Sequence, residues 1–266
     1  MTSTANGKPW ALITGASAGI GATFARALAR KGLNCVLVAR RKDRLDELAA
    51  ELTRDHGVEC RVFPQDLGEF DAPKRLFEYT QAQGLEISTL INNAGFGSHG
   101  KFIELDPEWE MRMIDVNCRA LVGISRMYAP RMAERGRGQI VHLASVAAFQ
   151  PCPYMSTYGA TKAFILMFSE ALWAEMLAHG VHVTAVCPGP TQSEFFQVAR
   201  YGAARGREFV VETSEVVVER GLAALEANRL YMVSGFINWM KAFAVRFFPR
   251  SLVARVAAFI LTPGKH

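Results

Sequence analysis

The sequence has few cysteines, and they are widely spaced. At least 25 positions separate each cysteine from the next, so neither a CxxC pair nor a zinc-ligand spacing occurs. We interpret them as reduced, mostly buried thiols of a cytoplasmic protein. They are Cys35, Cys60, Cys118, Cys152 and Cys187.

Long apolar runs and dense charge are missing too. The first residues, MTSTANGKPW, lack the apolar segment of a secretory signal. No stretch has the roughly 18 uncharged apolar residues that a membrane-spanning helix needs. The net charge is +5, and basic runs do not exceed two or three residues, so nucleic-acid binding is not predicted. The 50% hydrophobic content excludes a disordered chain.

What is present is an alternation of short apolar runs with helical patterns. The runs predict strands at Trp10–Thr14, Cys35–Ala39, Cys60–Pro64, Thr89–Asn92, Gln139–Ala144, Val181–Val186 and, more weakly, 230–235. Helices are predicted at Ala22–Lys31, Asp43–His56, Ala72–Gln83, Glu108–Glu134, Tyr158–Ala178 and within 208–229.

This alternation predicts an α/β fold with a doubly wound parallel β-sheet (a Rossmann fold) in three layers, α/β/α. No linker or repeat divides the chain, so we expect a single domain. It would consist of a core at 8–187, a substrate-loop region at 188–229 and an apolar C-terminal tail at 230–266.

A glycine-rich turn follows the first strand directly and opens the first helix. In the run TGASAGIG, Gly15 permits a tight turn, Gly19 lets the backbone approach a pyrophosphate, and Gly21 lets the helix pack on the strand. The phosphates would then face free N–H groups at the start of the helix. Together with Ser17 and Ile20, these glycines predict a dinucleotide site.

The end of the second strand indicates which dinucleotide. An NAD site usually has Asp or Glu there, to hold the ribose 2′-hydroxyl. This chain has Arg40 and Arg41 instead, and a guanidinium pairs with a 2′-phosphate. The cofactor predicted is therefore NADP(H).

Tyr158 and Lys162 stand four positions apart near the start of a predicted helix, so both project from one face. A phenol transfers protons poorly near pH 7 unless its anion is stabilised, and a neighbouring ammonium lowers its pKa. Ser145, at the end of the fifth predicted strand, offers a hydroxyl to a carbonyl oxygen beside the phenol. These three residues form a candidate catalytic group.

The motifs TGASAGIG, NNAG (Asn92–Gly95), Asn117, Ser145, Tyr158-x-x-x-Lys162 and Pro188-Gly189 resemble the classical short-chain dehydrogenase/reductase family in order and spacing. The resemblance covers about residues 8–195. It implies that Tyr158 is the acid/base, that Ser145 orients the substrate oxygen, that Lys162 binds the nicotinamide ribose and that Asn117 orders a relay water. It also implies cofactor contacts at Asp66, Leu67, Asn93, Ala94, Gly95, Tyr158, Lys162, Pro188, Gly189 and Thr191.

One position departs from the family. Some NADP-dependent relatives carry a basic residue just before the second glycine of the motif, where this chain has Ala18. The prediction of NADP(H) therefore depends mainly on Arg40, with Ser17 and Arg41 as support.

The expected substrate site is apolar and aromatic. Beside Ser145, its candidate residues are Phe96, Phe149, Tyr154, Phe195 and the adjacent Phe196. His99 and His142 lack a second ligand at useful spacing, so no metal is predicted. We expect a small-molecule ketone or alcohol as substrate, and the family resemblance implies a homodimer or homotetramer.

The tail divides at Pro249 into two short apolar helices marked by Lys and Arg. It could cover the substrate or contact another subunit, lie on a membrane surface, or pack in the core. A similar tail occurs in ketone reductases of the DltE type. The function predicted is NADP(H)-dependent reduction of a lipophilic ketone, or the reverse oxidation. The alternatives are a 3-oxoacyl-thioester reductase and a non-catalytic NADPH sensor.

Overall fold

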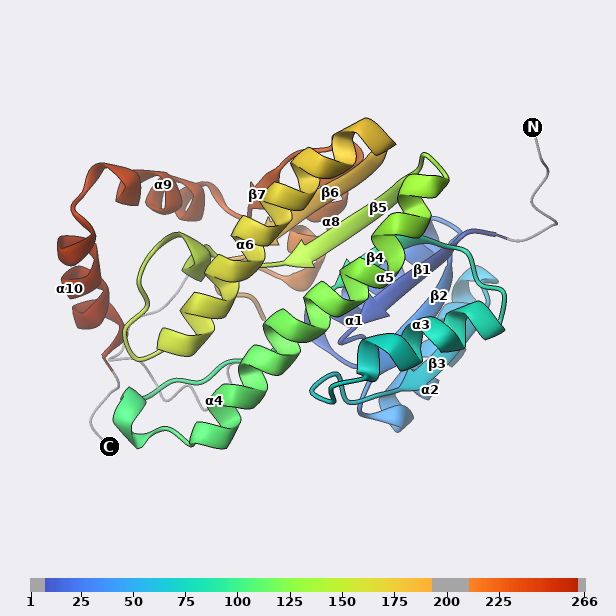
Figure 1. Ribbon diagram of the computed structural model, residues 1–266, viewed down its shortest axis with the longest axis horizontal. Coiled ribbons are helices and arrows are strands. Elements are labelled where there is room, and N and C mark those ends of the chain that lie inside the picture. The colour runs from blue at the N-terminus through green and yellow to red at the C-terminus, as the bar shows by residue number, and fades with distance from the viewer. Residues whose placement is uncertain (1–7, 193–210, 263–266) are drawn as a thin grey trace.

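Seven parallel strands form one sheet in the order β3-β2-β1-β4-β5-β6-β7 (Figure 1). The computed structural model describes residues 8–192 and 211–262. The strands are β1 (Trp10–Thr14), β2 (Asn34–Ala39), β3 (Cys60–Pro64), β4 (Ile87–Asn92), β5 (Gly138–Leu143), β6 (Val181–Cys187) and β7 (Tyr231–Val233). The predicted doubly wound sheet is confirmed.

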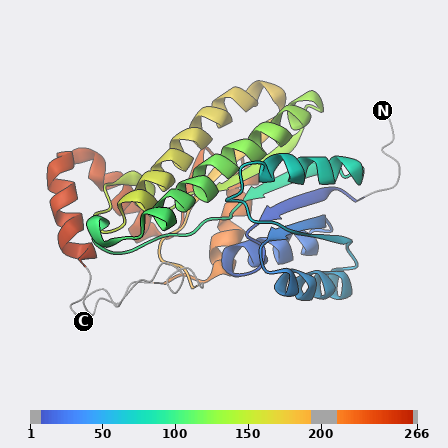
Figure 2. The ribbon, with the colours of Figure 1, turned by 60° about the horizontal axis from the view of Figure 1, so that its bottom comes forward.

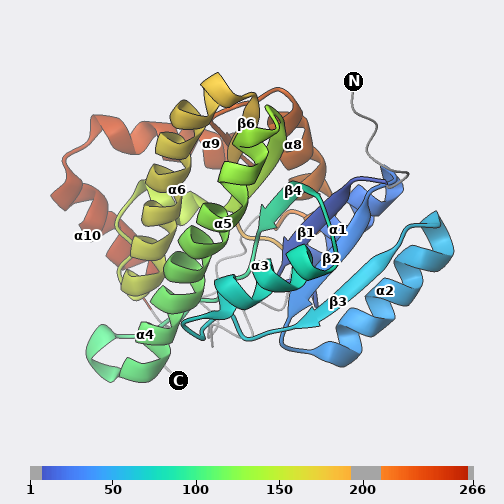
Figure 3. The same ribbon diagram turned by 45° about the vertical axis from the view of Figure 1, so that its right-hand side comes forward.

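Helices connect the strands and cover both faces of the sheet (Figure 3). They are α1 (Gly19–Arg30), α2 (Lys42–His56), α3 (Ala72–Ala82), α4 (Pro107–Ile114), α5 (Leu121–Glu134), α6 (Ser156–Met176), α8 (Ser214–Glu226), α9 (Phe236–Ala244) and α10 (Arg250–Leu261). Short 3₁₀ turns lie at Phe102–Glu104, Val146–Phe149, Leu177–His179 and Val245–Phe247.

Burial on both faces explains why the strands are continuous apolar runs. Every residue of β1 and β2 is buried. On one face Phe24 of α1 and Leu45 of α2 pack in a cluster with Val217 of α8. On the other face α3, α5 and α6 surround a second cluster, which contains Leu76 and Ile124. This is the three-layer arrangement predicted from the alternating pattern.

The predicted helical region Glu108–Glu134 is confirmed, but it is not one regular α-helix. Between α4 and α5 the chain forms a π-helical turn at Asp115–Ala120. Such π turns, with i→i+5 hydrogen bonds, are rare and occur often at functional sites. Asn117 lies within this turn.

The topology places a crevice at the carboxyl ends of the strands. The chain runs outward from β1 to β2 and β3 on one side and continues with β4 on the other. Ligands of doubly wound sheets bind at such a reversal of strand order. Figures 1 and 2 show α9 and α10, in red, at the end of the molecule to which this edge of the sheet points. Within the described residues, no helix has the length and apolar character needed to cross a bilayer.

Candidate functional site

The glycine-rich turn after β1 is built so tightly that it excludes side chains. Gly15 and Gly19 adopt positive φ angles of 67° and 53°, which L-residues with side chains rarely adopt. A Cβ atom at Gly21 would lie 2.2 Å from the carbonyl oxygen of Gly15. The backbone of the turn therefore stays open to a ligand at the start of α1, as expected for a pyrophosphate cradle.

The loop after β4 is locked against this turn. The Thr14 hydroxyl accepts hydrogen bonds from the backbone N–H groups of Asn93 and Ala94, at 2.9 and 3.0 Å. The Asn93 side chain donates to the carbonyl of Thr14 at 2.8 Å. These bonds fix the loop after β4 against the glycine-rich turn, so the NNAG motif shapes the site as well as lining it.

Two arginines lie where the 2′-phosphate of NADP(H) is expected. Arg40 is exposed and lines the cavity at the end of β2. The Arg41 guanidinium donates to the Ser17 hydroxyl at 3.1 Å, which ties the end of β2 to the glycine-rich turn. Asp66 is held by the backbone N–H of Gly68 at 2.9 Å and by an ion pair with Arg112. The cradle and these cations together fit a phosphorylated dinucleotide.

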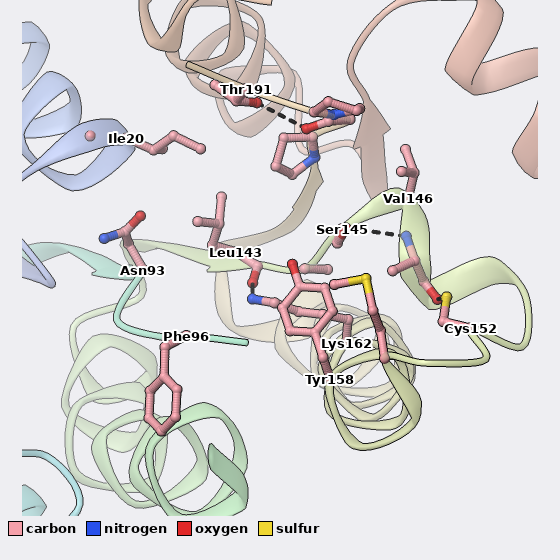
Figure 4. A pocket seen from close by; sticks show the side chains of 18 of the residues that line it. Ile20, Asn93, Phe96, Leu143, Ser145, Val146, Cys152, Tyr158, Lys162 and Thr191 are labelled. Carbon is pink, nitrogen blue, oxygen red and sulfur yellow. Dashed lines mark hydrogen bonds between the residues drawn. The ribbon is translucent and has the colours of Figure 1, made fainter. Parts of the chain in front are cut away.

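The candidate catalytic side chains converge on one wall of the cavity (Figure 4). Tyr158 and Lys162 project from the same face of α6, and Ser145 follows β5. The Lys162 ammonium donates to the carbonyl of Leu143 at 2.6 Å and lies 5.7 Å from the centre of the Tyr158 ring. The Ser145 hydroxyl accepts from the N–H of Ala147 at 3.1 Å, which fixes its position.

Burial dominates the acid–base properties of this group. It lowers the pKa of Lys162 to about 8, because a buried ammonium loses its hydration. It raises the pKa of Tyr158, and a hydrogen bond with Ser145 offsets only part of that rise. Desolvation is the largest cause of that rise. The influence of Lys162 on the Tyr158 phenol stays a prediction.

Asn117 is completely buried, and its side chain joins three segments. Its amide nitrogen donates to the carbonyl of Phe96 and to the hydroxyl of Thr161, both at 3.0 Å. Its amide oxygen accepts from the N–H of Phe96 at 3.1 Å. The π-helical turn thus lets Asn117 fix the loop after β4 against α6, which carries Tyr158. Its role toward a relay water stays a prediction.

One large cavity, of about 880 Å³, joins the dinucleotide cradle to the catalytic group. The residues predicted to contact cofactor line it, apart from Gly21, which packs behind the turn. The tail lines the cavity as well. A tail that covers the substrate was one of the predicted alternatives, but without assigned residues. The tail residues that line the cavity are Asn238, Lys241, Ala242, Ala244, Val245, Phe248, Leu252, Val253, Val256, Ala257, Ile260 and Leu261.

A sequence signal for this tail wall existed in α10. Val253, Val256, Ala257 and Ile260 recur at the spacing of one helical face, but so would residues of an ordinary core helix. The end of α10 is held in place by His99, whose Nε2 lies 2.9 Å from the carbonyl oxygen of Leu261. His99 therefore has a structural contact, and the described residues hold no cluster of three or more side chains suited to a metal.

Of the predicted substrate contacts, Ser145 and Phe96 line the cavity, whereas Phe149 and Tyr154 do not. Phe149 is absent from the lining among the described residues; its ring packs on Tyr231 at 5.7 Å between centroids. Tyr154 is absent from it as well, and its carbonyl accepts from the N–H of Gly100 at 2.8 Å. Phe96 borders the cavity, but its ring turns away from Tyr158 and packs on Trp109 (Figure 4). Phe195 and Phe196 lie outside the described residues.

The fold and the site together define an oxidoreductase of the kind that uses a nicotinamide dinucleotide. The family model described as short chain dehydrogenase matches residues 9–203. The chain belongs to the short-chain dehydrogenase family, and the predictions of family and enzyme class are confirmed.

Relatives and solved structures agree with this assignment. A very-long-chain 3-oxoacyl-CoA reductase of Anas platyrhynchos is 36% identical over 67% of this chain and 58% of its own length. This chain thus aligns with little more than half of that relative. A short-chain dehydrogenase from Sphingobium yanoikuyae, solved with NADPH, is 36% identical with a TM-score of 0.80, covering 90% of this chain and 93% of that one.

A third match concerns substrate size. The bulky-bulky ketone specific alcohol dehydrogenase from Comamonas testosteroni is 33% identical with a TM-score of 0.77. The match covers 91% of this chain and 93% of that one. The resemblance to ketone reductases of the DltE type is not addressed by these matches.

Proposed function

We propose that the protein is an NADP(H)-dependent reductase that converts a lipophilic ketone into an alcohol, or catalyses the reverse oxidation. The observation that carries the proposal is the position of Ser145, Tyr158 and Lys162. They lie in the wall of a cavity that continues from the dinucleotide cradle to an apolar wall made by α9 and α10. A cavity of about 880 Å³ suits a bulky substrate beside a cofactor.

Each of these residues would have its own role in the reaction. The glycine-rich turn and Arg40 would hold the cofactor, which supplies the hydride when bound. The Ser145 hydroxyl would donate a hydrogen bond to the ketone oxygen. Tyr158 would donate its phenolic proton to that oxygen as negative charge develops there. The ammonium of Lys162 would favour the phenolate left behind.

A 3-oxoacyl thioester is the second candidate substrate. It is favoured by the Anas platyrhynchos relative, which is a very-long-chain 3-oxoacyl-CoA reductase. Cationic side chains also line the cavity at Arg112 and at Lys241 of α9. Such cations would bind the phosphates of a coenzyme A or phosphopantetheine carrier. The ketone is preferred because Arg112 already pairs with Asp66.

A substrate panel tests the proposal. NADPH oxidation is measured with ketones graded from small aliphatic to steroid-sized and with 3-oxoacyl thioesters, with NADH in parallel. Turnover of bulky ketones with NADPH is the expected result. Turnover of thioesters alone would transfer the assignment to the second candidate, and tight NADPH binding without turnover of any compound would indicate a non-catalytic sensor. The predicted homodimer or homotetramer is tested separately by analytical ultracentrifugation.

A further inference from the structure

The helices α9 and α10 are apolar on two sides. One side lines the cavity, through residues such as Val253, Ala257 and Ile260. The other side is exposed: Phe236, Phe247 and Phe259 have 72%, 71% and 64% of their surfaces open to solvent and do not line the cavity. An ordinary surface helix would be polar there. Packing among residues 8–192 and 211–262 leaves the rings of Phe236 and Phe247 largely exposed on the outer side.

The outer side of α9 is an aromatic ladder. The rings of Phe236 and Trp239 lie 6.0 Å apart between centroids, those of Trp239 and Phe243 5.5 Å, and those of Phe243 and Phe247 5.3 Å. These contacts form a continuous row of large rings along α9 and the 3₁₀ turn that follows it. Figures 1 and 2 show α9, in red, at one end of the molecule. Aromatic rings are favoured at the boundary between lipid and water.

The charge of the same segment has one sign. Between Phe236 and Leu261 the sequence contains Lys241, Arg246, Arg250 and Arg255 and no Asp or Glu. None of these four side chains forms an ion pair within the described part of the chain. The guanidinium of Arg246 lies 5.9 Å over the Phe243 ring, so cation and aromatic surface occur side by side.

We propose that the outer side of α9 and α10 binds the surface of an anionic phospholipid bilayer. The charge decides between this occupant and a second copy of the chain. Lys241 lines the cavity, so the outer side has three cations, Arg246, Arg250 and Arg255. A twofold contact through that side would set the three of one copy against the three of the other, without a carboxylate on either segment. Anionic headgroups neutralise these cations, while the rings enter the acyl boundary.

The two-sided tail also links the bilayer to the cavity. The residues that would face lipid and those that line the cavity belong to the same two helices. A lipophilic substrate dissolved in the bilayer would therefore reach the protein next to the wall of its cavity. This step rests on the proposed function, whereas binding to the bilayer does not.

Co-sedimentation of the full-length protein with vesicles tests the proposal. The vesicles are phosphatidylcholine with and without a quarter of phosphatidylglycerol. The protein should pellet with the anionic vesicles and partition at least about tenfold less onto the neutral ones. Trp239 emission should shift to shorter wavelength on binding, and the Trp239→Phe variant should lose that shift.

Paired variants separate the apolar and the charged contributions. Phe236→Gln with Phe247→Gln should weaken vesicle binding by about tenfold or more. Arg250→Gln with Arg255→Gln should abolish the preference for anionic lipid. Phe164→Gln with Met167→Gln, which changes two exposed apolar residues of α6, is the matched control and should bind like the parent protein.

Two outcomes would overturn the proposal. The first is a protein that stays in the supernatant with both kinds of vesicle. The second is a dimer that the Phe236→Gln/Phe247→Gln variant disrupts while vesicle binding is absent, because the occupant is then a second copy. Turnover of a water-soluble ketone is measured in every variant. Because the substituted residues lie away from the cavity, that turnover separates a failure of this proposal from a failure of the proposed function.

Discussion

Arg40 is the side chain that we expect to select NADPH over NADH. It is exposed at the end of β2 and lines the cavity, whereas Arg41 is engaged with Ser17. A charge-assisted hydrogen bond contributes about 1.5–3 kcal/mol, and solvent screening at an exposed site reduces this to roughly 1–2 kcal/mol. Arg40→Ala should therefore raise the KM for NADPH roughly 5- to 30-fold and leave the KM for NADH nearly unchanged.

Steady-state kinetics with both cofactors measure this effect. Lys42→Ala is the matched control, because it removes a neighbouring cation that pairs with Asp46 and does not line the cavity. The control should change neither KM by more than about twofold. If Arg40→Ala left the ratio of the two KM values within twofold of the parent, the reasoning from the missing carboxylate at the end of β2 would be refuted.

Three further predictions follow from the packing. Gly21→Ala should weaken NADPH binding and lower the melting temperature by roughly 2–10 °C, because a Cβ there meets a backbone oxygen at 2.2 Å. Unchanged NADPH binding and an unchanged melting temperature would contradict the tight turn. Burial lowers the pKa of His142 to about 3, so stability present above about pH 6.5 is lost as the pH falls toward 3. Between pH 7 and pH 5 the unfolding free energy, measured by urea titration, should fall by roughly 1–2 kcal/mol less in His142→Gln than in the parent protein. Equal losses in the two proteins would contradict this. Ala257→Phe should reduce kcat/KM for steroid-sized ketones more than for small ones, and an equal reduction would argue against the tail wall.

Much of the fold followed from the sequence because both faces of the sheet are buried. The apolar run Trp10–Thr14 is β1 without any shift, and Cys60–Pro64 is β3. Other ends moved by one to three residues: α1 begins at Gly19 rather than Ala22, because the first turn of the helix belongs to the glycine motif. The π-helical turn at Asp115–Ala120 was missed because an apolar helical pattern indicates a helix without resolving a single turn of a different type within it.

The site divides into a part that local sequence determines and a part that it does not. Tyr158 and Lys162 could be placed on one side of a helix because four positions are about one turn. The position of Phe149 could not be derived, because the residue ends a 3₁₀ turn and its ring packs on Tyr231, which is distant in sequence. The tail wall depends on where α10 returns to the crevice, and no local pattern encodes that contact.

The proposed function makes Tyr158 the proton donor of a reductase. The most direct measurement compares Tyr158→Phe with the parent protein in NADPH-dependent ketone turnover and, separately, in NADPH binding. Tyr128→Phe is the control, because it also removes a buried phenol. The Tyr128 hydroxyl lies 2.8 Å from the Thr80 hydroxyl, and Tyr128 does not line the cavity. We expect a fall in kcat of about 10²- to 10⁴-fold for Tyr158→Phe with NADPH binding nearly intact, and little change for the control. Turnover by Tyr158→Phe comparable with that of the parent protein would exclude Tyr158 as the proton donor.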